Sequence, residues 1–76
     1  MRTPIEVGKL AESYIVVYVG NAECQTPDDV RKACELLISK AARAIEKYNG
    51  HQKAVEVLSR SMSYVAANPM PVGGVQ

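Results

Sequence analysis

The stretch TPDDVRKACELLISKAARAIEKYNGHQKAVEVLSRSMSYVAAN, residues 26–68, decides the fold because its pattern predicts two amphipathic helices joined at Asn49-Gly50. At its start, Thr26 precedes Pro27 and two aspartates. A hydroxyl before the first helical residue, a proline in the first turn and carboxylates near the positive end of the helix dipole all favour the beginning of a helix. The same stretch offers few groups suited to catalysis, so it predicts an architecture more directly than a reaction.

The first of these helices is expected over residues 27–48. Apolar side chains recur there at three- and four-residue intervals, and charged side chains occupy the other face. The apolar positions are Val30, Ala33, Cys34, Leu37, Ala41, Ala44, Ile45 and Tyr48. Asn49 and Gly50 tolerate left-handed backbone angles, and Asn49 with Gln52 has the spacing of a capping box for a new helix. The sequence therefore predicts a tight turn between antiparallel helices.

The second helix is expected over residues 51–67, since Pro69 disfavours a helical conformation in the residue before it. Its predicted apolar face consists of Ala54, Val55, Leu58, Met62 and Val65. Glu56 precedes Arg60 by four residues, which favours an ion pair on the helix surface.

The N-terminal segment predicts a further helix over residues 4–19. Thr3-Pro4-Ile5-Glu6 repeats the start signal of Thr26, with Thr3 and Glu6 at capping-box spacing. Residues 14–19, YIVVYV, are apolar on every side and rich in β-branched side chains, which also suits a buried strand. The capping signal and the helical period before this run favour the helix, and residues 20–25 are expected to form the connecting loop.

These segments predict one all-α domain over residues 1–68, an antiparallel helical hairpin plus an N-terminal helix, followed by a flexible tail over residues 69–76. A chain of 76 residues hides only about 60% of its unfolded surface on folding. Yet 47% of its residues are apolar. We therefore expect the hairpins to pack as a homodimeric or higher bundle, with the first helix across the two-fold interface. A compact monomeric three-helix domain is the alternative.

Charge and targeting signals exclude several classes of function. Nine Lys and Arg residues against eight Asp and Glu give a net charge of +1, and both signs alternate along the chain. Nucleic-acid and anionic-membrane binding lack their usual electrostatic driving force in such a chain. No apolar run reaches the length of a membrane span, and no apolar signal region follows Met1-Arg2. A cytoplasmic location without membrane association is expected.

Metal binding, cofactor binding and catalysis are not expected. Cys24, Cys34 and His51 match no zinc-binding pattern, and Cys34 is expected to be a small core residue. A disulfide between the two cysteines is disfavoured in a reducing cytoplasm. His51 lies beside a turn without an arranged nucleophile, and no glycine-rich phosphate loop precedes a helix. We therefore predict that the chain is not an enzyme and has no catalytic residues.

Residues 50–60, GHQKAVEVLSR, resemble the opening of a helix-turn-helix of the factor-for-inversion-stimulation type. In that family a Gly-Asn-Gln opening leads into an Ala-rich helix, a turn and a groove-reading helix. The resemblance implies a small DNA-binding transcriptional regulator, which is one alternative function. The chain departs from the family because no turn residue interrupts residues 56–64, and Asn68-Pro69 ends the helix before a recognition helix could follow.

The function predicted from the sequence is stoichiometric binding of a partner protein, with steric blocking of that protein. Short cofactor-free helical chains of this kind are typical of bacteriophage and mobile-element accessory genes, whose products block host defence, transcription or quorum-sensing factors. An oligomeric sponge for a signalling nucleotide is a further alternative. Aromatic and cationic groups are enriched at protein interfaces. The predicted partner-binding residues are Tyr14, Tyr18, Arg43, Tyr48, His51, Arg60 and Tyr64.

Overall fold

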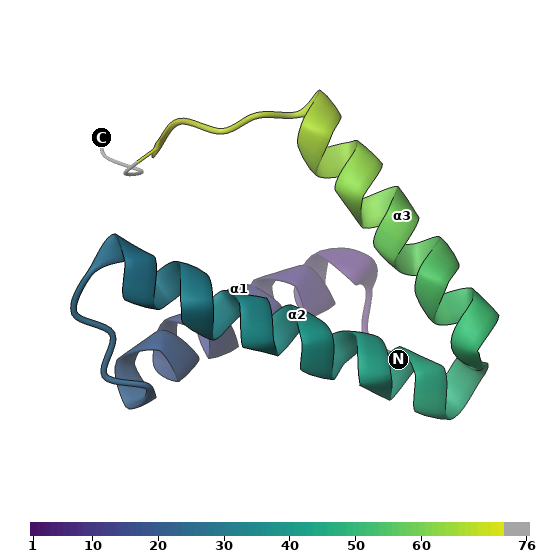
Figure 1. Ribbon diagram of the computed structural model, residues 1–76. Helices are drawn as coiled ribbons and strands as arrows, with labels where there is room; N and C mark the ends of the chain where they lie inside the picture. Colours follow the sequence, from purple (N-terminus) through teal and green to yellow (C-terminus); the bar gives the residue numbers. More distant parts are fainter. Residues whose placement is uncertain (73–76) are drawn as a thin grey trace. The chain divides into compact units, whose positions relative to one another are not determined.

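A computed structural model describes residues 1–72, which contain three α-helices and no strands. The helices are α1 (Pro4–Asn21), α2 (Pro27–Asn49) and α3 (His51–Ala67), shown in Figure 1. The prediction of an all-α fold is confirmed, and residues 14–19 are helical throughout. The chain divides into two compact units, unit 1 (Met1–Ser39) and unit 2 (Lys40–Gln76), and α2 contributes to both.

Helix α1 begins at the capping box that the sequence predicts. The backbone N–H of Glu6 donates to the Thr3 hydroxyl at 3.2 Å, and the Thr3 N–H donates to the Glu6 carboxylate at 3.0 Å. These two bonds give partners to the backbone N–H groups of Thr3 and Glu6, which have no acceptor within the first helical turn. Pro4 occupies the first helical position, where its missing N–H costs nothing.

Helix α1 ends two residues later than predicted, at Asn21. The N–H of Glu23 donates to the Gly20 carbonyl at 3.0 Å, and the N–H of Cys24 donates to the Val19 carbonyl at 3.3 Å. This pair of bonds is the Schellman arrangement, in which the residue after the cap adopts a left-handed conformation. Glu23 takes that position with φ 58°. Gly20, which the sequence places in the loop, lies inside the helix instead.

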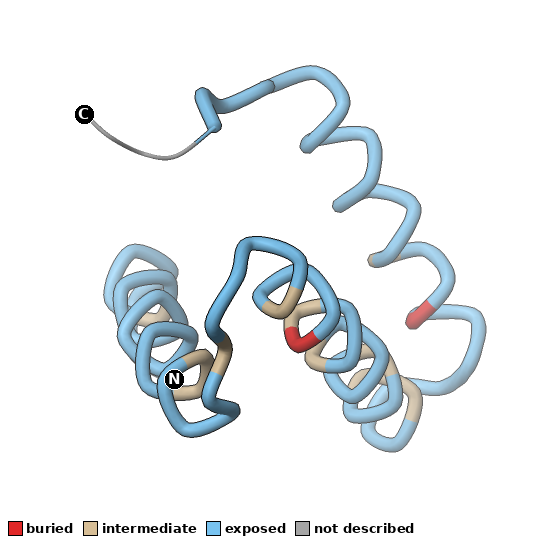
Figure 2. The backbone as a smooth tube through the Cα atoms, turned by 60° about the vertical axis from the view of Figure 1, so that its left-hand side comes forward, coloured by how far each residue is buried: buried red, intermediate tan, exposed pale blue. Residues whose placement is uncertain are grey.

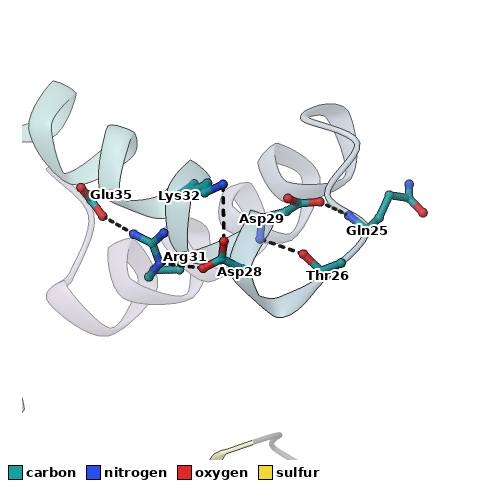
Figure 3. Close-up of polar contacts among 7 residues, drawn as sticks. All are labelled: Gln25, Thr26, Asp28, Asp29, Arg31, Lys32 and Glu35. Atoms are coloured by element: carbon teal, nitrogen blue, oxygen red, sulfur yellow. Dashed lines mark hydrogen bonds and ion pairs between the residues drawn. The ribbon is translucent and has the colours of Figure 1, made fainter.

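Helix α2 begins as predicted, at a cap built from Thr26 and Asp29 (Figure 3). The Asp29 N–H donates to the Thr26 hydroxyl at 3.1 Å, and the Asp29 carboxylate accepts the N–H of Gln25 at 2.9 Å. Farther along the helix, Arg31 bridges the carboxylates of Asp28 and Glu35 at 3.0 and 2.8 Å. These side chains are mostly exposed, so each ion pair adds at most about 1 kcal/mol.

In unit 1, α1 and the first part of α2 lie side by side and run in opposite directions (Figure 1). The Tyr18 hydroxyl donates to the backbone carbonyl of Ala33 at 2.7 Å, which joins the two helices. Ala33 is 9% exposed and is the only buried residue of this unit. A small side chain at this position lets the Tyr18 ring approach the α2 backbone.

In unit 2, a single residue connects α2 to α3. The N–H of Gly50 donates to the Glu46 carbonyl at 2.9 Å, and the Gly50 carbonyl accepts the N–H of Ala54 at 3.2 Å. Gly50 therefore closes one helix and opens the next. The capping box predicted between Asn49 and Gln52 is wrong, because Asn49 is the last residue of α2 and Gly50 caps α3 without a side-chain hydrogen bond.

Burial is sparse in both units, as Figure 2 shows. In the described part of the chain only Ala33 and Ala54 are buried, the latter at 4% exposure. Every residue from Leu58 to Val72 is exposed. The predicted core residue Cys34 is half-buried, as is Cys24, and neither forms a disulfide.

No helix within residues 1–72 combines the length and the apolar character that crossing a membrane requires. Residues 68–72 continue from α3 and are exposed. The predicted flexible tail, residues 69–76, falls partly on residues 73–76, which lie outside the described range.

Candidate functional site

The seven residues predicted to bind a partner differ in exposure. Tyr14, Tyr48 and Tyr64 are 66%, 77% and 70% exposed. The side chains of Arg43 and His51 are also largely exposed, as is Arg60, whereas Tyr18 is half-buried. Two of the seven, Tyr14 and Tyr18, belong to unit 1, and the other five belong to unit 2.

In unit 1, the two tyrosines occupy different environments on α1. The Tyr18 hydroxyl donates to the Ala33 carbonyl, so its side chain is used in the contact between α1 and α2. Tyr14 projects largely into solvent. Of the two tyrosines, Tyr14 therefore has the more accessible ring.

In unit 2, Arg43 and His51 meet at a shared carboxylate. The Arg43 guanidinium donates to Oε1 of Glu46 at 2.7 Å, and Nδ1 of His51 lies 2.6 Å from Oε2 of the same residue. Arg43 and Glu46 are three residues apart on α2, while His51 begins α3. We call Arg43, Glu46 and His51 the elbow cluster, because it joins the two helices across Gly50.

The elbow cluster favours the charged form of its carboxylate. The hydrogen bond from His51, followed by the one from Arg43, lowers the pKa of the Glu46 carboxyl below its ordinary value, although desolvation acts in the opposite direction. The Glu46 side chain is only 26% exposed, whereas its two partners point largely into solvent. The cluster therefore presents a cationic group and an imidazole outward from an anionic centre.

The elbow cluster places a carboxylate against an imidazole. A carboxylate and the imidazole that it orients are two of the three members of a nucleophilic triad, and the third member is a hydroxyl or thiol beside the other ring nitrogen. Within residues 1–72 no hydrogen bond joins His51 to a serine or cysteine.

Nearby, the Lys47 ammonium lies 5.4 Å from the centroid of the Tyr48 ring, a cation–π contact that leaves the ring largely exposed.

Farther along α3, Arg60 and Tyr64 lie four residues apart, which places them on the same helical face. The predicted ion pair between Glu56 and Arg60 is wrong, because Glu56 pairs with Lys53 at 3.0 Å. Arg60 forms no ion pair with any of residues 1–72. Arg60 and Tyr64 are both exposed. A guanidinium that is accessible in this way can bind a carboxylate with two parallel hydrogen bonds.

The structure thus joins Arg43 to His51 through Glu46, and it places Arg60 and Tyr64 one helical turn apart on α3. The residue that the sequence prediction missed is Glu46, which the periodic pattern assigns to the charged face of the helix. Its three-residue spacing from Arg43 was a usable signal, since such pairs meet on a helix surface. Its contact with His51 had no comparable signal, because it depends on the backbone angles of Gly50.

Metal ligands are not grouped in the part of the chain that the structure covers. Among residues 1–72, no three His, Cys, Asp or Glu side chains lie close enough together to hold an ion.

Comparison of the chain with protein-family models, with curated proteins and with solved structures found no match.

Proposed function

We propose that this chain is a small non-enzymatic binding module that self-associates as a homodimer or a higher oligomer and blocks a partner protein by occupying its surface. The proposal includes a cytoplasmic location and, in its most specific form, inhibition of a host defence, transcription or quorum-sensing factor by a bacteriophage or mobile-element product. Its chemistry is contact between surfaces, without a covalent step.

One observation carries the proposal: many residues of the chain are apolar, but few of them are buried. The chain is 47% apolar, yet only two alanines are buried within residues 1–72. Large apolar side chains on all three helices are exposed. Burial of apolar surface is the main favourable term in association, and extended exposed patches mark interaction sites in soluble proteins. This surface supports self-association and binding of a partner.

The partner surface is proposed on the face of α3 that carries Arg60 and Tyr64. Tyr64 supplies ring area for an apolar pocket, and Arg60 supplies a guanidinium for a carboxylate on the partner. Tyrosine and arginine are enriched among the few residues that dominate binding energies at interfaces. The chemistry of the partner is therefore an apolar pocket with an acidic group beside it.

The remaining predicted residues extend this proposal. In unit 2, Arg43, Tyr48 and His51 lie near the turn. They are a solvated guanidinium, an aromatic ring and an imidazole, and they contribute to the orientation and rate of association more than to affinity. In unit 1, Tyr14 is the proposed anchor, while Tyr18 acts indirectly by holding α1 on α2.

The test uses the purified protein as bait in lysate from cells in which the gene acts. Wild type is expected to recover one protein in stoichiometric amount. The variants Tyr64→Ala and Arg60→Ala should each weaken that capture, by about 2 kcal/mol or roughly thirtyfold in Kd for a true anchor. Ser59→Ala is the matched control, because Ser59 is exposed on the same helix but is turned by about 100° or more away from both Arg60 and Tyr64.

Loss of capture with Ser59→Ala as well, or capture that is unchanged by Tyr64→Ala and Arg60→Ala, would remove this surface from the proposal. Absence of any stoichiometric protein would overturn the blocking function. Recovery of DNA whose binding falls steeply with salt would favour the regulator instead. A melting temperature raised by a signalling nucleotide would favour the sponge.

A further inference from the structure

Helices α2 and α3 are separated by a break of one residue in a nearly continuous hydrogen-bond ladder. The N–H of Gly50 donates to the Glu46 carbonyl, and the N–H of Ala54 donates to the Gly50 carbonyl, both at the four-residue separation of an α-helix. Among the described residues, the bonds that a single helix would add here are those from residues 51–53 to residues 47–49. Gly50 causes the break, because its angles of φ 94° and ψ 159° are not helical. A change of backbone angles at this residue would therefore join residues 27–67 into one helix.

An apolar pattern continues through the break without a change of register. From residue 41 to residue 65, positions at alternating intervals of three and four residues are all apolar except His51. This is the seven-residue repeat of helices that pair along a narrow stripe. The charged residues of this stretch all lie at other positions. We call the members of the stripe the seam: Ala41, Ala44, Tyr48, His51, Val55, Leu58, Met62 and Val65.

The bent arrangement leaves the seam uncovered, because every seam residue is exposed. Val55 and Leu58 are 43% and 40% exposed, and Tyr48, Met62 and Val65 are more exposed still. In unit 2, the side chains within residues 40–72 that are buried or half-buried lie outside the seam, and they are Ala42, Ile45, Glu46, Ala54 and Val57. Burial around Gly50 and the seam thus use different positions of the same two helices.

We propose that α2 and α3 join into one continuous helix when two copies of this chain associate, and that the seams of the two copies then pack against each other in antiparallel orientation. This inference rests on the self-association included in the proposed function and names the surface that associates. The seam is straight only in the continuous helix, so a second copy binds that conformation in preference to the bent one. Such a difference in affinity is what shifts a conformational equilibrium.

The seam is complementary to itself when two copies are related by a two-fold axis at residue 53. Residues equally far from the axis then face each other, as in any symmetric pair of this kind. Small side chains meet larger ones at the two ends of the seam, which lets facing layers interdigitate. The facing pairs are Ala41 with Val65, Ala44 with Met62, Tyr48 with Leu58, and His51 with Val55.

The length of the seam favours a second copy as its occupant. The seam runs about 36 Å along a continuous helix, whereas α1, with 18 residues, is about 27 Å long. The Tyr18 hydroxyl also joins α1 to Ala33 in unit 1. The same stretch of a second copy matches the seam over its full length.

The area of the seam predicts a dimer that dissociates on dilution. At a helix width of about 10 Å, the flat projection of the seam is about 360 Å² per copy. Specific interfaces use about 800 Å² of accessible surface per partner, and interfaces at the small end of the range belong to weak complexes. The two copies should therefore separate at low concentration.

The pairing leaves the face with Arg60 and Tyr64 free. Arg60 is two residues after Leu58, and Tyr64 is two residues after Met62, so each is turned by about 200° around the helix from its neighbour in the seam. Tyr48 and His51 are used in the pairing itself. A dimer formed through the seam would carry two outward copies of the Arg60 and Tyr64 face.

The first test replaces the residue that causes the break. In the bent arrangement Gly50→Ala is strained, because φ 94° is a conformation that side chains rarely adopt. In a continuous helix the same change is favourable, because alanine is the better helix former. By light scattering over a dilution series, wild type is expected to pass from twice its 8.3 kDa chain mass to the monomer mass. Gly50→Ala should stay dimeric to a concentration roughly tenfold lower, or beyond.

Gly8→Ala is the matched control. Gly8 lies inside α1, and a Cβ atom there meets nothing within 4 Å. This change also removes a glycine from a helix but lies outside the seam, so the dissociation concentration should equal that of wild type. A Gly50→Ala variant that unfolds, or that dimerises less tightly than wild type, would overturn the continuous helix.

The second test measures distances between spin labels in the dimer. Labels at Lys40→Cys and Ser63→Cys in one copy, mixed with unlabelled protein, should lie about 35 Å apart along a continuous helix. They should lie closer together if the break at Gly50 persists. Copies with Ser63→Cys alone should place their two labels about 30 Å apart along the axis of the antiparallel pair, but side by side in a parallel pair. Cys24→Ser and Cys34→Ser remove the other labelling sites.

The outcomes separate the two proposals. A dimer that keeps the shorter distance between its Lys40 and Ser63 labels, or that brings its two Ser63 labels side by side, would overturn the antiparallel seam and leave self-association standing. A wild type that is monomeric at every concentration would overturn self-association and the seam together. The long distances in a dimer that Gly50→Ala strengthens support both.

Discussion

At the residue scale, Glu23 occupies a position that ordinarily suits glycine. It follows the cap of α1 with φ 58°, and the two hydrogen bonds of the Schellman arrangement depend on that conformation. A side chain with a Cβ atom is strained in the left-handed region by roughly 1–2 kcal/mol. The end of α1 is therefore held at a local cost in conformational energy.

We predict that Glu23→Gly increases the free energy of unfolding by about 0.5–1 kcal/mol, since relief of the strain exceeds the entropy that glycine loses on folding. Urea denaturation at matched protein concentration measures this change. Glu12→Gly, in the middle of α1, is the control and should lower the free energy of unfolding by about 1 kcal/mol. A destabilised Glu23→Gly variant would contradict this account of the α1 terminus.

At the scale of elements, the elbow cluster couples the end of α2 to the start of α3 through one carboxylate. The pKa of Glu46 is lower in the folded chain than its ordinary value of 4.5. A group with a lowered folded-state pKa contributes stability that is fully present above its unfolded pKa and is lost as the pH falls through its folded pKa. The coupling between α2 and α3 should therefore weaken in acid.

We predict that Glu46→Gln lowers the melting temperature at neutral pH, and that this difference from wild type disappears as the pH falls well below 4.5. Thermal melts followed by circular dichroism across this range measure the difference, and comparison with wild type cancels the titration of the other carboxylates. Glu12→Gln is the control and should show no such pH-dependent difference. A difference that persists unchanged in acid would show that Glu46 acts through packing rather than charge.

At the scale of the whole molecule, the described chain has little buried apolar area of its own. Within residues 1–72 only Ala33 and Ala54 are buried, and no large side chain is fully buried. Chains of this size are marginally stable as monomers unless they associate. Stability should then depend on how many copies are assembled.

We predict that the melting temperature of the wild-type protein rises with protein concentration, because assembly stabilises the folded state by mass action. Melts over a hundredfold dilution measure this rise. The variant Met62→Glu, which places a charge on the exposed apolar face of α3, should lower the melting temperature and reduce its dependence on concentration. A melting temperature independent of concentration in wild type would argue against a folded state maintained by association.

The sequence by itself determined the helices. The caps at Thr3 and Thr26, the prolines after them and the helical period predict where α1 and α2 begin, because capping and periodicity act within about four residues. The same local signals predict that α3 ends before Pro69. The end of α1 was missed because Gly20 is a stronger signal for a helix end than Glu23, although the left-handed residue is Glu23.

The tertiary structure alone decided how side chains on different helices are used. It directs the Tyr18 hydroxyl to Ala33 and brings His51 to Glu46. It also leaves Arg60 without an ion pair among the described residues, while Glu56 pairs with Lys53. Periodicity can assign a side chain to a helical face, but it cannot show what that face meets. Contacts between helices depend on connection geometry and on partners distant in sequence, which local propensities do not encode.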